Sequence, residues 1–173
     1  MEPLSTSHLM LDYEAVMESR TFLRSWSVSN WPDDHFRMED NHEDLKNHNW
    51  EHQHQIAFTY TILTPDKKQC MGCVYINPNQ RIEPVTEKET AILEQRPANV
   101  RFWTRNSIHN TSKENIILND LISWFTEIWE MKDILFSCNK KVPSQITLFR
   151  TSGLMLWLEL QQSSRHELLW CIK

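Results

Sequence analysis

The spacing of apolar residues predicts two helices in the first third of the chain. Residues 11–26, "LDYEAVMESRTFLRSW", carry side chains that recur at the three- and four-residue intervals of one helical face. These side chains are Tyr13, Val16, Met17, Arg20 and Leu23. Residues 40–55 form a second and more polar helical stretch. We therefore expect two helices before the first long strand.

A hairpin and a third strand are predicted next. Residues 55–66, "QIAFTYTILTPD", and residues 69–78, "QCMGCVYINP", are rich in β-branched and aromatic side chains, and "TPDKKQ" supplies the turn between them. Residues 98–105, "ANVRFWTR", have the same strand character. The segment 79–97 between them is charged and contains prolines, which indicates an insertion with one helical turn near Glu87–Leu93.

The longest amphipathic pattern covers residues 114–129. Its apolar side chains lie on one face of a helix, which must pack on a sheet or on other helices. They are Ile117, Leu118, Leu121, Ile122, Phe125, Ile128 and Trp129. Thr111 and Glu114 have the spacing of a capping box at the start of this helix. The first N–H groups of a helix attract anions, but Glu114 already supplies one, so the sequence favours a helix that caps itself.

The remaining pattern predicts a strand, a helix and two closing strands. Residues 133–138 read as a buried strand, and residues 142–154 as a short helix that ends at Gly153. Residues 154–162 and 165–173 read as two strands. In "LMLWLEL" the leucines alternate with Met155, Trp157 and Glu159, the pattern of a strand covered on one side.

Composition indicates one globular domain, residues 1–173, because 40% of the residues are hydrophobic and the length suffices for a full core. Lysine and arginine number 18 against 23 acidic residues, a net charge of −5, which argues against nucleic acid or an anionic membrane as the main partner. The longest apolar runs are far shorter than the roughly 20 residues that span a bilayer. We therefore expect a cytoplasmic protein.

Cysteine and histidine patterns offer two metal hypotheses. Cys70 and Cys73 form a C-x-x-C, which is typical of a redox pair or half of a zinc site, yet all four cysteines lie in apolar stretches and read better as buried thiols. His48 and His52 are one helical turn apart in a segment that also contains His42 and His54. That segment lacks a further ligand at matching spacing, so a solvated helix face is favoured and no metal is expected.

The order of the predicted elements resembles the GNAT superfamily of N-acyltransferases. "VRFWTR" leads into an amphipathic helix, a strand "ILFSCN" follows, and "LFRTSGL" precedes the final two strands. The resemblance implies an α+β fold with a mixed, mostly antiparallel sheet of about six or seven strands and about four helices. The first edge strand of the family is shortened to "LSTSHLML". The implied reaction moves an acetyl group from acetyl-CoA to an amine.

The resemblance also implies a coenzyme A site. In the family, a loop with a basic residue and two glycines holds the CoA pyrophosphate, and His109 stands at the basic position while Ser112 and Glu114 replace the glycines. The residues implied to contact CoA are Phe102, Trp103, Thr104, Arg105, His109, Asn110, Thr111, Ser112 and Lys113. The fourth family strand bulges there and aims a backbone N–H at the thioester carbonyl. Phe102 and Trp103 read equally as core residues.

Catalytic side chains stay unassigned. Phe149 occupies the position of the family tyrosine that protonates the CoA thiolate, and phenylalanine has no proton to donate. Three glutamates of the insertion, Glu83, Glu87 and Glu89, are weak candidates for a general base. The resemblance places Trp31, His35 and Trp50 beside the acceptor.

Three functions follow from these patterns. The leading hypothesis is an N-acetyltransferase that binds acetyl-CoA through a divergent pyrophosphate loop. Its acceptor would be the amine of a small molecule or of a protein. The alternative is a non-catalytic GNAT-fold protein that acts as a binding or interaction module. A zinc protein built on the histidine segment is a distant third. A monomer or a homodimer fits each of them.

Overall fold

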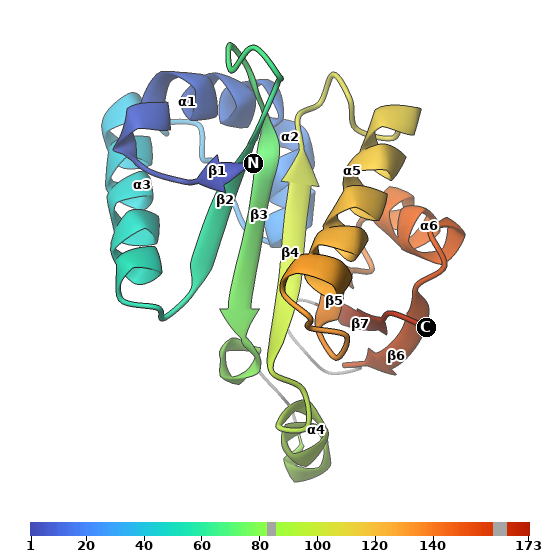
Figure 1. The fold of residues 1–173 in the computed structure, drawn as a ribbon. Helices are drawn as coiled ribbons and strands as arrows, with labels where there is room; N and C mark the ends of the chain where they lie inside the picture. Colours follow the sequence, from blue (N-terminus) through green and yellow to red (C-terminus); the bar gives the residue numbers. More distant parts are fainter. Residues whose placement is uncertain (83–85, 161–165) are drawn as a thin grey trace. The chain divides into compact units, whose positions relative to one another are not determined.

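The computed structural model describes residues 1–82, 86–160 and 166–173. The chain divides into two compact units. The first contains Met1–Asn77 and Phe102–Ile108, and the second contains Pro78–Arg101 and His109–Lys173. Within the described residues the strands form a seven-stranded sheet in the order β1-β2-β3-β4-β5-β7-β6 (Figure 1). This sheet and its helices confirm the predicted α+β fold. β4 (Ala98–Thr104) contributes residues to both units. The single domain 1–173 stays a prediction.

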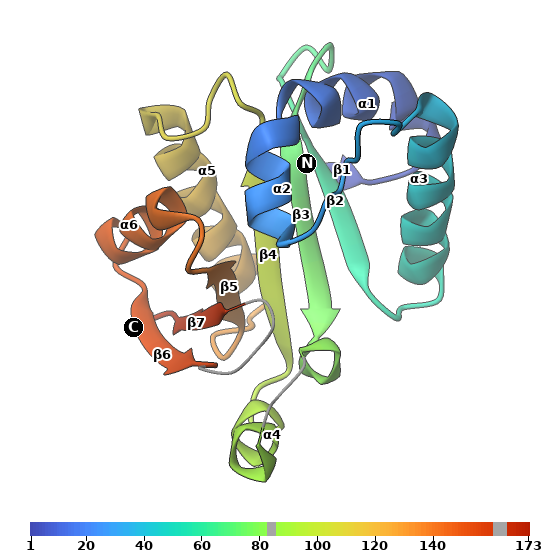
Figure 2. The same ribbon diagram turned by 180° about the vertical axis from the view of Figure 1, so that it is seen from behind.

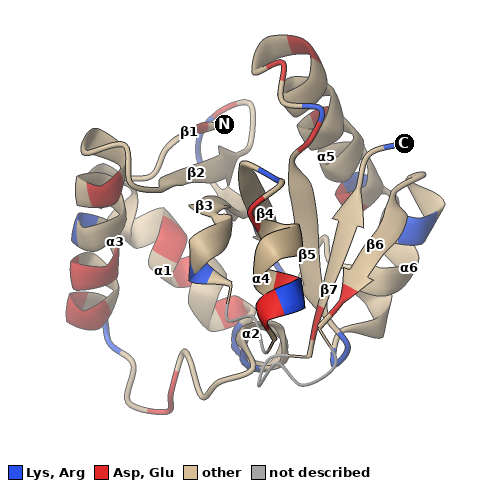
Figure 3. Ribbon diagram, turned by 90° about the horizontal axis from the view of Figure 1, so that it is seen from below, with Lys and Arg blue, Asp and Glu red and all other residues tan. Residues whose placement is uncertain are grey.

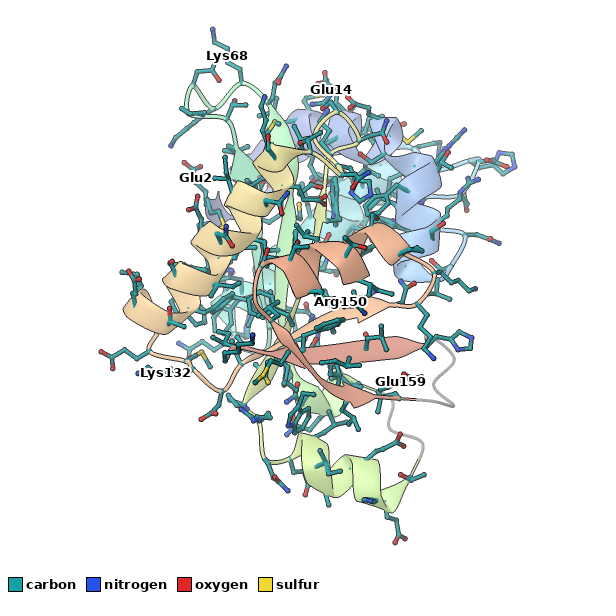
Figure 4. The ribbon with its side chains drawn as sticks, turned by 90° about the vertical axis from the view of Figure 1, so that its right-hand side faces the viewer. Glu2, Glu14, Lys68, Lys132, Arg150 and Glu159 are labelled. Atoms are coloured by element: carbon teal, nitrogen blue, oxygen red, sulfur yellow. The ribbon has the colours of Figure 1, made fainter. Side chains whose placement is uncertain are left out.

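The first unit contains the predicted hairpin. β2 (Phe58–Leu63) pairs antiparallel with β3 (Cys70–Pro78), and the turn between them carries Lys68, which projects away from the strands (Figure 4). The register shifts between Ile62 and Leu63, where β3 carries a bulge. The hairpin prediction is therefore confirmed, and the bulge is a feature that the alternation of residue types did not reveal.

The predicted edge strand "LSTSHLML" is wrong. The edge strand is β1, which covers only Glu2–Pro3, and a 3₁₀ turn at Thr6–His8 follows it. The Ser5 backbone N–H donates to His8 Nδ1 at 3.2 Å, and the Ser5 hydroxyl lies 3.3 Å from the same atom. Such local side-chain to backbone bonds favour the start of a helix over a strand.

Three helices cover the first unit (Figures 1 and 2). They are α1 (Leu9–Glu18), α2 (Arg20–Ser27) and α3 (Met38–Gln53). The single helix expected over residues 11–26 is divided at Ser19, whose φ of −98° and ψ of 8° are not helical. The rings of Trp26 and His48 lie 5.7 Å and 5.4 Å from the ring of Tyr75, so α2 and α3 pack on the face of β3 that bears Tyr75.

The second unit is built on a parallel pair and an antiparallel pair of strands. β5 (Leu135–Asn139) runs parallel to the first residues of β4 and antiparallel to β7 (Glu167–Cys171). β6 (Met155–Glu159) pairs antiparallel with β7 and forms the edge. The predicted insertion contains a 3₁₀ turn at Asn79–Arg81 and the short helix α4 (Glu87–Leu93).

The amphipathic helix is confirmed with a changed end. α5 covers Ser112–Ser123 and continues as a π-helical turn over Trp124–Ile128. The side chains of Leu118, Leu121 and Phe125 are buried as expected. Ile128 is 70% exposed, which contradicts the expectation, because the wider π turn rotates the last residues away from the buried stripe.

Aromatic rings join the helices of the second unit to its sheet. The Phe136 ring on β5 contacts Phe125 at 5.9 Å and Phe149 at 6.2 Å between ring centroids. Phe149 lies on α6 (Pro143–Thr151), so α5 and α6 cover the same face of β5. The helix predicted over 142–154 is thereby confirmed, and Gly153 follows its end with φ of +84°, the left-handed conformation that glycine adopts readily.

The alternation expected along β6 is wrong. Leu154 and Leu160 are buried, but Leu156 is 49% exposed and Met155 is 44% exposed. A register shift between Leu156 and Leu158 also interrupts the ladder with β7, so strict alternation does not continue through the strand. The end of this predicted strand and the start of the next lie outside the described residues.

Candidate functional site

The end of β4 is held closely against β3 in the first unit. A Cβ atom added to Gly72 would lie 2.0 Å from the carbonyl oxygen of Trp103, and Gly72 has φ of +146°, so only glycine permits this approach. The side chains of Phe102 and Trp103 are fully buried. The Trp103 indole N–H donates to the Tyr75 hydroxyl at 3.1 Å. Both aromatic residues are therefore core residues of this unit.

The hydrogen bonding of β4 changes along its length. Its parallel pairing with β5 consists of Asn99 with Leu135 and Val100 with Phe136, and it stops there although both strands continue. Beyond that point the Phe102 carbonyl accepts a hydrogen bond from the Trp26 indole at 2.8 Å. The second half of β4 therefore no longer pairs with β5, and its Phe102 carbonyl is bonded within the first unit.

The loop after β4 is anchored at the break between α1 and α2. Glu18 accepts hydrogen bonds from Arg105 Nε at 2.5 Å and from the Ser107 backbone N–H at 3.1 Å. The Ser19 hydroxyl accepts the Asn106 backbone N–H at 2.9 Å. Partial burial alone would raise the pKa of Glu18, but the hydrogen bonds and charge of Arg105 and the bonds from Ser107 lower it overall. The predicted CoA contact Arg105 is therefore already paired with a carboxylate.

The start of α5 contains a buried carboxylate in the second unit. Glu114 is 1% exposed, and its two oxygens accept the Asn110 backbone N–H at 2.7 Å and bond His109 Nδ1 at 3.0 Å. Thr111 is the N-cap in an extended conformation, and its side chain does not cap the helix. Thr111 is therefore the N-cap as predicted, but its side chain takes no part, and Glu114 accepts the backbone N–H of Asn110, the residue before it.

His109 links this carboxylate to a hydroxyl on α6. His109 Nε2 lies 3.1 Å from the Ser144 hydroxyl. An ionised Glu114 can only accept, so His109 Nδ1 carries the proton and Nε2 accepts the proton of Ser144 when the imidazole is neutral. The chain hydroxyl–imidazole–carboxylate fixes this tautomer. This arrangement of hydroxyl, imidazole and carboxylate is the one that enzymes use to activate a hydroxyl group as a nucleophile. It also connects the loop before α5 to α6.

Sequence reasoning missed Ser144. It follows Pro143 at the first position of α6, where a serine reads only as a residue of a helix start. Its contact with His109 joins residues 35 positions apart. Nothing in the local pattern signals that contact.

Phe149, at the position of the family tyrosine, is a core residue. Its ring makes edge contacts with Phe136 at 6.2 Å and with Trp170 at 5.9 Å, and it is fully buried. Edge-to-face packing of this kind stabilises a core by roughly 0.5–1.5 kcal/mol per pair beyond area burial. Phe149 therefore packs the sheet to α6.

The residues predicted to face the acceptor have different surroundings. His35 lines an open hollow together with Asp33, Asp34, Phe36, Arg37 and Asp40. Trp31 packs edge-on against Phe36 at 6.0 Å. Trp50 is 53% exposed and stacks on His54 at 4.4 Å. Of the three, His35 is the one that lines the acidic hollow.

His48 and His52 of α3 pack against β2 and β3, so the solvated helix face expected for this pair is wrong. His48 contacts the Thr59 hydroxyl at 3.2 Å, and the ring of His52 packs edge-on against Phe58 and Tyr60. All four cysteines are free and buried, as the sequence predicts. Among the described residues the group able to surround a metal ion is Asp12, Cys70 and Cys73. In the same parts of the chain, no helix is both long and apolar enough to cross a membrane.

Comparison with known proteins gives structural matches only. No protein-family model and no curated protein matches the sequence. The structure is similar to that of RimL, a ribosomal L7/L12 α-N-protein acetyltransferase in complex with coenzyme A, with a TM-score of 0.73, 16% identity, and coverage of 99% of this chain and 92% of that chain. It is also similar to the microcin C7 self-immunity acetyltransferase MccE in complex with acetyl-CoA and AMP, with a TM-score of 0.69, 13% identity, and coverage of 98% and 88%.

A third similar structure is a variant of the spermidine N-acetyltransferase SpeG from Vibrio cholerae. Its TM-score is 0.64 and its identity is 11%, with coverage of 99% of this chain and 92% of that chain. All three proteins are acetyltransferases, and the matches extend over nearly the whole chain. At these low identities the similarity establishes the fold.

Proposed function

We propose that this chain, which has the fold of the GNAT acetyltransferases, transfers an acetyl group from acetyl-CoA to an amine. The observation that carries the proposal is the register of β4. Its pairing with β5 stops at Val100, and the Phe102 carbonyl accepts its hydrogen bond from Trp26 within the first unit. A strand that parts from its neighbour in this way leaves backbone groups on that edge without ladder partners, and a ligand can bond to them.

The proposed cofactor contacts differ in how well they suit coenzyme A. Residues 102–105 fit, because a backbone N–H of this segment can stabilise a thioester oxygen without help from a side chain. The loop 109–113 fits less well, because the Glu114 carboxylate lies at the helix start where the resemblance places a pyrophosphate. When bound, acetyl-CoA supplies the activated acetyl group and a thiolate leaving group. The proposed mechanism is direct attack by the amine, and Phe149 donates no proton to the thiolate.

The acidic surface of α3 supports a cationic amine as the acceptor (Figure 3). Acidic side chains on this helix outnumber its one lysine, Lys46. They are Glu39, Asp40, Glu43, Asp44 and Glu51. The hollow that His35 lines also contains Asp33 and Asp34. A surface of this sign raises the local concentration of cations, and spermidine and a peptide α-amine are the acceptor types that the similar enzymes suggest.

A non-catalytic binding module is the second candidate. The observation that favours it is the buried Glu114 carboxylate, which occupies the start of α5 with an internal anion. A helix start that is already neutralised attracts a pyrophosphate less. The cytoplasmic location and the monomeric or homodimeric state remain predictions.

The test combines binding with turnover. Calorimetry with acetyl-CoA and with free CoA measures affinity, and a thiol-reactive dye measures CoA release in the presence of spermidine or a short peptide with a free α-amine. We expect saturable binding and release of CoA that depends on the amine. Peptide blocked at its α-amine is the control. Binding without amine-dependent release favours the binding module, and absence of both rejects acetyl transfer.

A further inference from the structure

The bulge in β3 brings two thiols to one face of the strand. Residues three apart in a regular strand point to opposite faces. Here Ile62 is paired with Gly72 and Leu63 with Cys70, so Met71 is the extra residue of the bulge. The side chains of Cys70 and Cys73 consequently lie on the same side. Their sulfur atoms and a carboxylate oxygen of Asp12 all lie within 4.8 Å of one another.

The carboxylate of Asp12 reaches this pair from α1 and is held in place. Cys73 Sγ donates to Asp12 Oδ1 at 3.3 Å, and Asn41 Nδ2 on α3 donates to Asp12 Oδ2 at 3.0 Å. The Thr61 hydroxyl on β2 donates to Cys70 Sγ at 3.5 Å. One oxygen of the carboxylate therefore faces the thiols while the other is fixed by an amide.

All three groups are removed from water. Asp12 is 3% exposed, and Cys70 and Cys73 are fully buried. In the described part of the chain, no lysine or arginine pairs with the Asp12 carboxyl group. Besides the thiols, the titratable groups that interact electrostatically with it are His48 and His8 and the Tyr75 hydroxyl. A buried carboxyl group beside two thiols, with no fixed cation, is a site where a divalent metal ion would offset most of the negative charge that these groups carry as ligands.

We propose that Asp12, Cys70 and Cys73 bind a Zn²⁺ ion that fastens α1 to β3. Two thiolates and a carboxylate suit zinc, which prefers sulfur ligands and tetrahedral geometry, and a water completes the fourth position. Asn41 orients the carboxylate from outside the coordination sphere, as amides and carboxylates do at many metal sites. The site lies within the first unit and does not depend on acetyl transfer.

Loading of the site is coupled to folding. The ligand atoms are inaccessible in the folded chain, so zinc enters while the first unit folds. Each thiol that becomes a ligand releases its proton to solvent, and an S–Zn bond replaces the S–H bond. The S–Zn bonds form without any change of oxidation state. Binding therefore releases about two protons from the thiols, which a pH-sensitive dye detects when reduced, unfolded chain is refolded with zinc in weak buffer.

The experiment measures metal in the full-length chain purified from zinc-supplemented medium under reducing conditions. We expect one zinc ion per wild-type chain by elemental analysis. Cys138→Ser is the matched control, because Cys138 is also a buried thiol, whose pKa burial raises to about 12, and it lies in the second unit. It should keep the metal. Cys73→Ser should lose it, and Asn41→Ala should weaken binding by about tenfold to a hundredfold.

Two further measurements keep the proposal open to refutation if Cys73→Ser does not fold. Asp12→Asn preserves the volume of the side chain and removes a buried charge, so it should fold yet hold less zinc than wild type. Refolding wild type with Co²⁺ should produce thiolate-to-cobalt absorption that Cys138→Ser retains and Asp12→Asn changes. The proposal is overturned if the reduced wild type refolded with zinc holds no metal, if Asp12→Asn holds as much as wild type, or if thiol counting finds Cys70 and Cys73 joined in a disulfide despite zinc.

Discussion

His109 and Glu114 form a hydrogen-bonded pair at the first turn of α5, with 3.0 Å between Nδ1 and a carboxylate oxygen. The other oxygen accepts the Asn110 backbone N–H, so the partial positive charge of the helix start is met by a group of the chain itself. In a helix that binds phosphate, the ligand supplies this negative charge. Glu114 therefore provides internally what the resemblance assigns to the CoA pyrophosphate.

The charge of Glu114 should weaken CoA binding. Glu114→Gln keeps an oxygen for the Asn110 N–H, and its amide can donate to His109 if the imidazole adopts the other tautomer. Removing one charge near a helix start is expected to change the binding free energy by about 0.3–1 kcal/mol, which is a fall in Kd of about twofold to fivefold by calorimetry. Wild type itself should bind acetyl-CoA weakly, with a high-micromolar Kd or above.

Asp120→Asn supplies the control for this variant. Asp120 lies on the exposed side of α5 and undergoes the same change of charge farther from the helix start. It should leave the affinity for CoA unchanged. If the two variants change the affinity for CoA equally, the net charge of the protein matters and the position of the charge does not. A sub-micromolar Kd of wild type for acetyl-CoA would contradict the prediction of weak binding.

Phe149→Tyr restores the tyrosine of the family, but it should not restore a general acid that protonates the CoA thiolate. Phe149 is fully buried between Phe136 and Trp170, so the hydroxyl of Phe149→Tyr would enter an apolar core. A buried hydroxyl without a partner costs about 1–3 kcal/mol, which urea unfolding measures. Phe149→Leu, which stays apolar, controls for the altered packing. An increase in kcat of Phe149→Tyr without loss of stability would place this position beside the reacting atoms instead.

The Glu18–Arg105 contact predicts a pH-dependent stability. The pKa of Glu18 is lowered in the folded state, so its contribution is complete above the unfolded-state pKa and is lost as the pH falls through the folded-state pKa. Glu18→Gln should therefore be less stable than wild type by about 0.5–1 kcal/mol at neutral pH, and the difference should disappear as the pH falls below the folded-state pKa of Glu18. Urea unfolding at several pH values measures this.

Glu14→Gln is the matched variant on the same helix, because the Glu14 side chain projects from α1 at its exposed surface (Figure 4). Its stability should follow that of wild type across the pH range. If Glu18→Gln differs from wild type by the same amount at neutral and acidic pH, the ionised carboxylate does not hold the Arg105–Ser107 loop.

The sequence predicted the elements whose pattern is local and periodic. β4, α5 and the β2–β3 hairpin have continuous apolar patterns that a single strand or helix satisfies. The division at Ser19 was missed, because the hydroxyl of this residue accepts a hydrogen bond from Asn106, 87 positions away. The bulges in β3 and β6 were missed because a bulge depends on the partner strand, which a pattern of one strand does not contain.

The candidate site was less predictable than the fold. The resemblance identified His109 as the basic residue of the loop, but its partners Glu114 and Ser144 come from a turn later and from another helix. Cys70 and Cys73 were recognised as a pair, whereas Asp12 joins them from 61 positions away. Chemistry that is assembled by contacts between distant segments leaves no periodic signal in the chain.

Replacing Ser112 and Glu114 by glycine tests whether the start of α5 can still accept a phosphate. The double variant removes the internal carboxylate and lets the backbone approach the ligand, so CoA affinity should rise by about 1–2 kcal/mol of binding free energy. Loss of the Glu114 hydrogen bonds and two added glycines should lower stability without ligand by about 1–2 kcal/mol. The variant should therefore melt below wild type alone but gain more from added CoA in a thermal-shift series. Glycine at the exposed Asn115 and Asn119 is the control for backbone freedom alone, and it should lower stability without improving affinity. If the Ser112 and Glu114 variant behaves like this control, Glu114 serves only to cap the helix, and the non-catalytic function becomes the better explanation of the fold.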